Sequence, residues 1–155
     1  MEKAALKEHR RHSTADKPFS YYISNIPEYF PNAPMHWHKE FELNVILEGE
    51  GDFVTGDIHF TAYKGDIVLT PPDMLHAVYQ HDDKRCVYDT LDLDGSMLGS
   101  RDNGRAADAF IAPLISGAYS IETHITPEHC YYSELLTTAE NMISAAKGDT
   151  PLLDM

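Results

Sequence analysis

The feature that most restricts the fold is a series of short β-type runs between Phe19 and Leu93, each closed by turn residues. Runs of this length, rich in Val, Ile, Thr, Tyr and Phe, are typical of antiparallel strands. The glycines within 48–51 and 55–57 predict hairpin turns, because glycine readily adopts the positive φ that such turns require. We therefore expect a mostly β fold, a sandwich or barrel, with strands at 19–23, 35–38, 41–47, 53–55, 58–63, 66–70, 76–79 and 85–93.

Polar and helical segments flank this β-region. Residues 1–17 are polar and partly basic, and they predict a short helix or a mobile arm. Residues 105–114 have a helical composition, and residues 119–125 offer one more strand. We therefore divide the chain into an N-terminal arm at 1–17, a β-barrel at 18–94 and a helical extension at 95–155.

The clearest helix is predicted at 127–147. Thr126 offers an N-cap before Pro127, and Gly148 offers a stop. Apolar residues recur at the spacing of an amphipathic helix, which indicates a face that packs on the barrel. The same stripe is wide enough to serve as a dimer seam, and it comprises Tyr132, Leu135, Leu136, Ala139, Met142, Ile143 and Ala146.

The C-terminal residues repeat a helix-start signal. Asp149, Thr150 and Pro151 resemble a cap followed by a first-turn proline, and an apolar pair follows them before the last residue, Met155. Because an isolated turn of helix is marginal in water, we expect this sequence to be part of a longer protein.

The charge of the chain restricts its partners. Twelve Lys and Arg residues against 25 Asp and Glu residues give a net charge of −13. We expect weak or no DNA binding by this chain alone, because clustered positive charge is what binds phosphate backbones. The N-terminus lacks the apolar stretch of a signal peptide, and no apolar run is long enough to cross a membrane. These features predict a cytoplasmic protein without a membrane partner.

Four side chains form a candidate metal site. His36, His38 and Glu42 have the same parity, so an extended chain would project all three from one face. His76 begins a later strand, and a barrel can place it opposite the other three. Three imidazoles and one carboxylate are ligands that suit one divalent ion of Zn, Ni, Fe or Mn.

These residues resemble the two sequence motifs of the cupin family. His36, His38, Glu42 and Gly49 fit the first motif, and Gly65, Pro71 and His76 fit the second. The four positions that hold metal in the family are intact. Three flanking positions depart from the pattern: the leading glycine of the first motif is Phe30, the inner glycine of the second is Asp73, and the asparagine that often follows the second motif is Gln80. The resemblance implies a cupin barrel, a double-stranded β-helix.

The rest of the chain resembles the sensor half of AraC-type transcriptional regulators. The resemblance rests on residues 17–19, 35–42 and 110–114 and on the long helix that follows them. It implies that the barrel binds a small effector, with a sugar as the family-level expectation, and that the 127–147 helix mediates a homodimer. In that family a separate C-terminal domain reads DNA, and no such domain lies within these 155 residues.

Two alternatives stay open at this level. The four side chains can line an effector pocket that holds no metal, since many sensors of this family bind their effectors without one. The chain can also be a stand-alone metal-dependent cupin enzyme, such as a dioxygenase or an isomerase, built on the same ligands. A simple metal store has only the number of histidines in its favour.

Other residues have structural interpretations. Trp37 lies between two candidate ligands and is expected to point away from them and to pack. One face of the 85–93 strand lines the barrel, either Tyr88, Thr90 and Asp92 or the residues between them. Cys86 and Cys130 are expected to be buried apolar residues. The remaining histidines are expected to be solvated, and they are His9, His12, His59, His81, His124 and His129.

Overall fold

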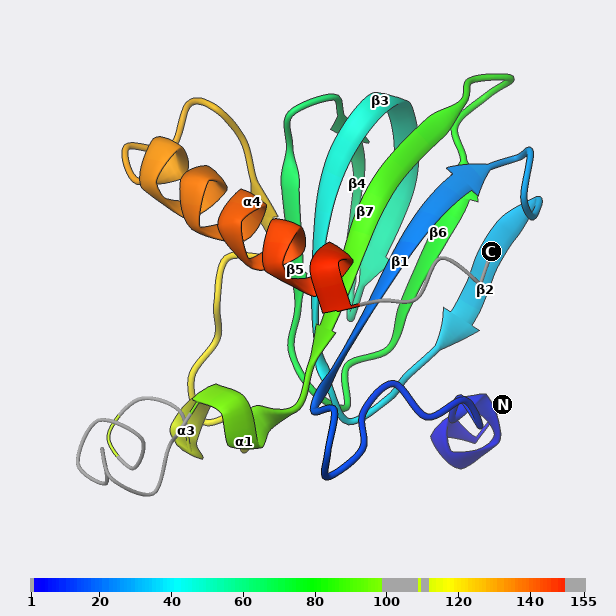
Figure 1. The fold of residues 1–155 in the computed structure, drawn as a ribbon. Helices are drawn as coiled ribbons and strands as arrows, with labels where there is room; N and C mark the ends of the chain where they lie inside the picture. The colour runs from blue at the N-terminus through cyan, green and yellow to red at the C-terminus, as the bar shows by residue number, and fades with distance from the viewer. Residues whose placement is uncertain (1, 99–108, 110–111, 150–155) are drawn as a thin grey trace.

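The computed structural model of the chain describes residues 2–98, 109 and 112–149. Two antiparallel sheets enclose a core, and a long helix, α4 (Tyr132–Asp149), crosses the outer face of one of them (Figure 1). The strands are β1 (Phe19–Ile26), β2 (Asn32–His36), β3 (Phe41–Thr55), β4 (Ile58–Tyr63), β5 (Ile67–Thr70), β6 (His76–Gln80), β7 (Cys86–Leu93) and β8 (His124–Ile125). The short helical segments are η1 (Lys3–Leu6), α1 (Gly95–Leu98) and α3 (Ala112–Ile115). The expected mostly β architecture with a C-terminal helix is confirmed.

Strand β3 belongs to both sheets. Its first half pairs with β7 and β5 in a sheet ordered β1-β7-β3-β5-β8, and its second half pairs with β4 and β6. Strand β2 extends the second sheet by pairing with β6. Figure 1 shows β3 curving from one sheet into the other, which closes the barrel along one side.

The predicted hairpin turn at 48–51 is wrong, because β3 runs through it without reversing. The register against β7 shifts between Ile46 and Glu48, and this bulge bends the strand. Gly49 has a φ of 73°, and a β-carbon there would lie 1.7 Å from the carbonyl oxygen of Arg85. The glycine therefore permits the bulge and the close approach of the chain at Arg85. The bulge needs the same positive φ as a turn. The second predicted turn, at 55–57, is confirmed by the pairing of Thr55 with Ile58.

Two apolar clusters hold the layers together. One lies inside the barrel, and its buried members are Ile26, Ile46, Phe53, Ala62, Val68, Val78, Cys86 and Tyr88. The other lies between the first sheet and α4, and its buried members are Phe41, Leu43, Val45, Ile67, Leu91, Leu93, Ile125, Ala139, Ile143 and Ala146. Successive residues of a strand point to opposite faces, so β3 and β7 contribute alternately to the barrel interior and to the α4 side.

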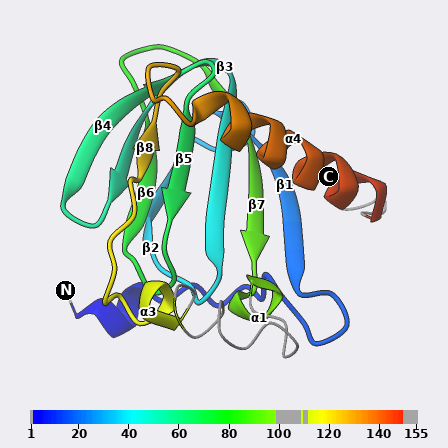
Figure 2. The same cartoon turned by 90° about the vertical axis from the view of Figure 1, so that its left-hand side faces the viewer.

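Helix α4 begins later than predicted. The backbone N–H of His129 donates to the Thr126 carbonyl over 3.0 Å, and the Thr126 N–H donates to the His129 ring over 3.0 Å. Residues 126–131 therefore form a turn instead of the first helical turn, and the helix runs from Tyr132 to Asp149, past the expected stop at Gly148. Figure 2 shows α4 lying across the outer face of β5, β3, β7 and β1.

Three smaller expectations need correction. The strand expected at 119–125 is only His124–Ile125. Of the helical segment expected at 105–114, the structure assigns 112–115 to α3, while 105–108 and 110–111, like 150–155, lie outside the described residues. Cys86 is buried as expected, but Cys130 is exposed because it lies in the turn before α4. Within the described residues, no helix is both long and apolar enough to span a membrane.

Candidate functional site

The four predicted ligands converge inside one end of the barrel. Their potential ligand atoms all lie within 4.8 Å of one another. The Nε2 atoms of His38 and His76 are each 3.4 Å from Glu42 Oε2. His36 faces His76 across the β2–β6 pair, and their ring centroids are 4.1 Å apart. The predicted convergence is therefore what the structure shows.

The geometry that produces this convergence differs from a single extended strand. Strand β2 ends at His36 and β3 begins at Phe41, so residues 37–40 form a connection between two strands. His38 lies in this connection, whereas Glu42 lies on β3 beside Asp92 and Thr70 of the adjacent strands. Shared parity identified the right residues, but the chain reversal between β2 and β3 brings them together.

Two of the histidines are oriented as metal ligands. His36 Nδ1 lies 2.7 Å from the carbonyl oxygen of Pro34, and His76 Nδ1 lies 2.8 Å from that of Met74. A carbonyl oxygen only accepts, so each Nδ1 carries a hydrogen, and in the neutral ring Nε2 would present its lone pair to the cluster. The Nε2 of His76 is buried without a hydrogen-bond partner. Metal-binding histidines usually donate from their second nitrogen in this way, so the donor set fits a divalent metal.

Burial and mutual charge set the pKa values of the cluster. Burial raises the pKa of Glu42, but the neighbouring His76 and His38 outweigh it and hold that pKa well below its ordinary value. Burial lowers the pKa of His76, but the Glu42 carboxylate outweighs it and raises that pKa. The pKa of His36 is lowered by burial and by the adjacent His76. Glu42 is therefore held as a carboxylate, the form that binds metal.

The N-terminal arm contributes two residues that the sequence did not reveal. His12 is buried, although it was expected to be solvated, and its Nε2 lies 2.7 Å from Glu8 Oε2. Its Nδ1 lies 2.7 Å from Asp92 Oδ2 and 3.1 Å from the hydroxyl of Tyr22. Burial lowers the pKa of His12, but Asp92 and Glu8 outweigh it and raise the pKa to about 11. His12 is therefore an imidazolium between two carboxylates, with its ring centroid 4.8 Å from that of His38.

A cavity of about 1220 Å³ opens beside this cluster. His36, Glu42 and His76 line it, and His38 is buried behind them. The open question about strand β7 is answered by the same cavity, since its walls on that strand are Tyr88, Thr90 and Asp92. The residues between them face α4, where Leu91 joins the outer cluster and Asp89 lies 3.0 Å from Lys147 Nζ.

The sequence of residues 18–105 matches the family described as the AraC-like ligand binding domain. The match covers more than half of the chain. This chain belongs to that family. The two-sheet barrel is the fold expected from the cupin motifs, and the chain is an AraC-like ligand binding domain.

Individual proteins show more distant similarity. The chain is 27% identical over 89 residues to the uncharacterized HTH-type transcriptional regulator YdeC of Bacillus subtilis (strain 168), covering 57% of this chain and 31% of that protein. The chain thus spans about a third of this relative's length. Among solved structures, a cupin protein from Bacteroides fragilis has a TM-score of 0.47 at 18% identity, covering 54% of this chain and 71% of that one. A predicted oxalate decarboxylase from Thermotoga maritima has a TM-score of 0.41 at 21% identity, covering 47% and 64%.

In this AraC-like domain, Trp37 holds the arm against the barrel. Its indole Nε1 donates to the Lys3 carbonyl over 2.7 Å, and the ammonium groups of Lys3 and Lys7 lie 5.3 and 5.4 Å from the ring centroid. Its backbone carbonyl accepts from the Glu8 N–H over 3.0 Å. Trp37 packs away from the ligand cluster, as predicted, and its partner is the arm. These contacts place Glu8 and His12 at the cluster.

Other histidines also have partners that their sequence positions concealed. His81 Nδ1 lies 2.8 Å from Asp52 Oδ1. His124 Nε2 lies 2.8 Å from Asp66 Oδ2, and its ring stacks on Phe60 with centroids 4.2 Å apart. The ring of His129 closes the turn before α4. The expectation of solvated side chains was wrong for these, whereas His9 and His59 are exposed as expected.

Asp73 replaces the inner glycine of the second cupin motif without loss of its geometry. Its φ is 60°, a left-handed conformation that Asp tolerates better than most residues. Its backbone N–H donates to the carbonyl oxygen of His38 over 2.8 Å. Asp73 therefore keeps this hydrogen bond in place of the motif's glycine. The bond joins the 37–40 connection, where His38 lies, to the loop before His76.

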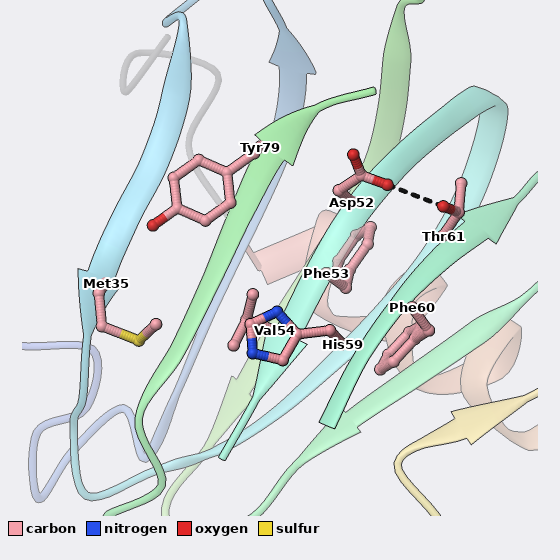
Figure 3. Close-up of a pocket in the computed structure, with 8 residues that line it drawn as sticks. All are labelled: Met35, Asp52, Phe53, Val54, His59, Phe60, Thr61 and Tyr79. Carbon is pink, nitrogen blue, oxygen red and sulfur yellow. Dashed lines mark hydrogen bonds between the residues drawn. The ribbon is translucent and has the colours of Figure 1, made fainter. Parts of the chain in front are cut away.

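A second, smaller hollow of about 440 Å³ lies over β3, β4 and β6 (Figure 3). Asp52, one of its polar residues, accepts a hydrogen bond from Thr61 over 2.8 Å and pairs with His81. In the described part of the chain, the buried polar side-chain atoms that lack a well-aligned hydrogen bond are His38 Nδ1, His76 Nε2 and both carboxylate oxygens of Asp92, although Asp92 Oδ2 has the His12 ring at 2.7 Å as an ion-pair partner. None of these residues lines the smaller hollow, whereas His76 and Asp92 line the large cavity.

Proposed function

We propose that this domain senses a small-molecule effector, which binds in the 1220 Å³ cavity, for a cytoplasmic AraC-type transcriptional regulator. The supporting observation is the cavity itself, which has a cluster of buried imidazoles and a carboxylate at its wall and lies within the residues that match the family. We assign residues 1–17 as the arm, 18–94 as the cupin barrel and 95–155 as the helical extension. DNA contact would come from another domain of the regulator.

A divalent metal is part of this proposal. His36, His38, Glu42 and His76 would hold one ion of Zn, Ni, Fe or Mn through imidazole nitrogens and a carboxylate oxygen. Such an ion would offer a Lewis-acidic position to oxygen atoms of an effector. The chain's own residues set the geometry, because Pro34 and Met74 fix the tautomers of two ligands, and Asn44 Nδ2 donates to Glu42 Oε1 over 2.7 Å.

Metal titration tests this part of the proposal. The purified chain, stripped with a chelator, should take up one divalent ion per chain. His76→Ala removes a ligand and should weaken uptake about 100-fold or more, a larger effect than losing an outer hydrogen bond to a ligand. His59→Ala lies outside the cluster and should leave uptake unchanged. Affinity should fall as the pH drops, because protonated imidazole does not bind metal, and the raised pKa of His76 should start this fall above the ordinary histidine value of about 6.5.

Failure of the unmodified chain to take up metal would overturn the metal assignment. Effector binding is measured separately, with the same chelator-treated protein and isothermal titration calorimetry. Binding of an effector to the metal-free chain would support an effector pocket that is built from the same four side chains and holds no ion.

We also propose a homodimer through α4 and the turn before it, residues 127–147. Ile143 is buried against the barrel, whereas Leu135, Leu136 and Met142 are only partly buried there and leave apolar edges for a partner. Light scattering at high micromolar concentration should show a dimer, and Met142→Glu should shift it to a monomer that remains folded. A monomeric unmodified chain would contradict the dimer and leave the sensor proposal in place.

The competing function is a metal-dependent cupin enzyme on the same four ligands. The complete ligand set supports it, while the family match and the similarity to a regulator support the sensor. The two functions differ in the fate of the bound molecule. Recovery of an unchanged ligand after prolonged incubation with metal-loaded protein supports the sensor, and conversion of that ligand supports the enzyme.

A further inference from the structure

The large cavity is lined by more basic than acidic residues, although the chain as a whole is strongly acidic. The chain has 25 Asp and Glu residues and 12 Lys and Arg residues. Three of the acids line the cavity, namely Glu8, Glu42 and Asp92, whereas four of the basic residues do, namely Arg10, Arg11, Lys17 and Lys147. A third of the basic residues thus surround one cavity in a strongly acidic protein.

The acids of the cavity lie against histidines and not against its Lys and Arg residues. Glu8 and Asp92 each lie 2.7 Å from a nitrogen of His12, and Glu42 Oε2 lies 3.4 Å from both His38 and His76. These acids are thus in contact with histidines of the cluster, and in the described part of the chain none of them forms an ion pair with Arg10, Arg11 or Lys17.

Most of the basic residues of the cavity are not compensated. Among the described residues, the Lys and Arg side chains that form ion pairs are Arg85, outside the cavity, and Lys147, which pairs with Asp89. Arg10, Arg11 and Lys17 are left without a carboxylate partner in that part of the chain. Arg10 and Arg11 are also largely exposed, which places them at the cavity mouth.

Aromatic side chains stand beside these cations. Tyr22, Tyr29, Phe30 and Tyr88 line the cavity, and the Arg10 guanidinium lies 4.3 Å from the ring centroid of Tyr22. A guanidinium held over a ring keeps its N–H donors directed sideways, where an oxyanion can accept two of them. The cavity therefore combines an apolar wall with unpaired donors at its mouth.

We propose that the effector is an organic anion: an apolar, ring-sized body with a delocalised oxyanion bound by Arg10, Arg11 and Lys17. The inference rests on the proposed sensor function and names the class of its ligand. A neutral sugar would leave the three cations unpaired and would make little use of the aromatic walls. Carboxylate, sulfonate and phosphate share the required chemistry, because each offers at least two oxygens to a guanidinium.

A pair of fluorescent probes that differ in charge tests the proposal. 8-Anilinonaphthalene-1-sulfonate carries an anion, and N-phenyl-1-naphthylamine has the same aromatic body without it. The sulfonate should bind with one site per chain, at least tenfold more tightly than the amine, and its affinity should fall with added salt. Absence of sulfonate binding, or equal affinity for the two probes, would overturn the proposal.

Matched variants locate the effect. The double variant Arg10→Gln/Arg11→Gln should weaken sulfonate binding about tenfold or more and leave amine binding unchanged. The control Lys64→Gln/Lys84→Gln removes the same net charge from exposed turns outside the cavity and should change neither probe. If both double variants weakened sulfonate binding equally, the overall charge of the protein would explain the effect, and a specific anion site would be contradicted.

Displacement of the bound sulfonate then distinguishes the ligand classes. Benzoate and phenyl phosphate should displace the probe, with their order of potency separating carboxylate from phosphate, while benzamide and arabinose should not. Displacement by arabinose or benzamide as effective as that by benzoate would overturn the anion proposal and support the cavity as a sensor of neutral molecules. Circular dichroism of every variant confirms that the fold is kept.

Discussion

At the end of the barrel that holds the ligand cluster, the two faces of the sheet β1-β7-β3-β5 carry different kinds of side chain. On the outer face, Leu43 and Val45 of β3 and Leu91 of β7 pack beneath α4. On the inner face, the residues between them are polar, and Glu42 and Asp92 lie opposite each other across the two strands. The same strands therefore carry a hydrophobic layer on one side and a cluster of buried charges on the other, alternating residue by residue.

The two faces differ in what their burial does to the folded state. Burial of apolar side chains on the outer face is favourable in itself, and no precise partner is needed. Burial of Asp92, which is 1% exposed, is unfavourable unless a cation stands beside it. Burial and the nearby Glu42 raise the pKa of Asp92, and His12 counteracts them. The arm thus supplies the cation that offsets the unfavourable burial of Asp92.

Removal of outer packing should have the largest effect on stability. Ile143→Ala deletes a buried side chain of α4 and should lower the free energy of unfolding by about 3 kcal/mol, measured by urea denaturation. Ser144→Ala, on the exposed side of the same helix, should change it by less than about 0.5 kcal/mol. Metal affinity should be unchanged in both, and a weakened affinity in Ile143→Ala would show that the two faces are not separable.

Removal of the inner cation should have a somewhat smaller effect. His12→Ala leaves the Asp92 carboxylate buried without its nearest counter-charge, and the loss of a buried partner costs about 3–5 kcal/mol in proteins. Because burial and the nearby Glu42 raise the pKa of Asp92, its carboxyl can take up a proton when His12 is removed, and we expect about 2 kcal/mol in chelator-treated protein. His9→Ala, exposed on the same arm, is the control. The double variant His12→Ala/Asp92→Asn should recover part of the loss, and full additivity of the two changes would contradict the pairing.

The outer face and the ligand cluster could both be predicted from the sequence, but for different reasons. The α4 stripe is a local periodicity, and it identified Ala139, Ile143 and Ala146 as core residues. The four ligands formed two motifs of fixed spacing, so no three-dimensional information was needed to select His76. Asp92 was recognised only as one of two alternating sets on its strand, because alternation shows that a face exists without showing which way it points.

The remaining parts of the site depend on contacts that leave no local pattern. His12 lies in a polar arm, where a buried histidine and a solvated one have the same neighbours in sequence; its burial follows from the contacts of Trp37 with the arm. Gly49 gave the wrong element because a bulge and a turn share a positive φ, and the choice depends on the path of β7 beside it. Long-range packing decided both cases.

The smallest effect should come from the backbone that joins the ligand loops on the inner face. Asp73 has a φ of 60°, and its N–H donates to the His38 carbonyl over 2.8 Å. Asp73→Gly, which restores the residue of the cupin motif, should change the free energy of unfolding by only a few tenths of a kcal/mol, since glycine adopts this φ without strain. Asp73→Ala should lose about 1 kcal/mol, because alanine has neither that freedom nor a polar side chain suited to the left-handed region.

Urea denaturation and metal titration of the two variants provide the measurement. Equal stability of Asp73→Ala and Asp73→Gly would show that the positive φ is not required in solution, and the contact between the loops would then have to be maintained by other residues.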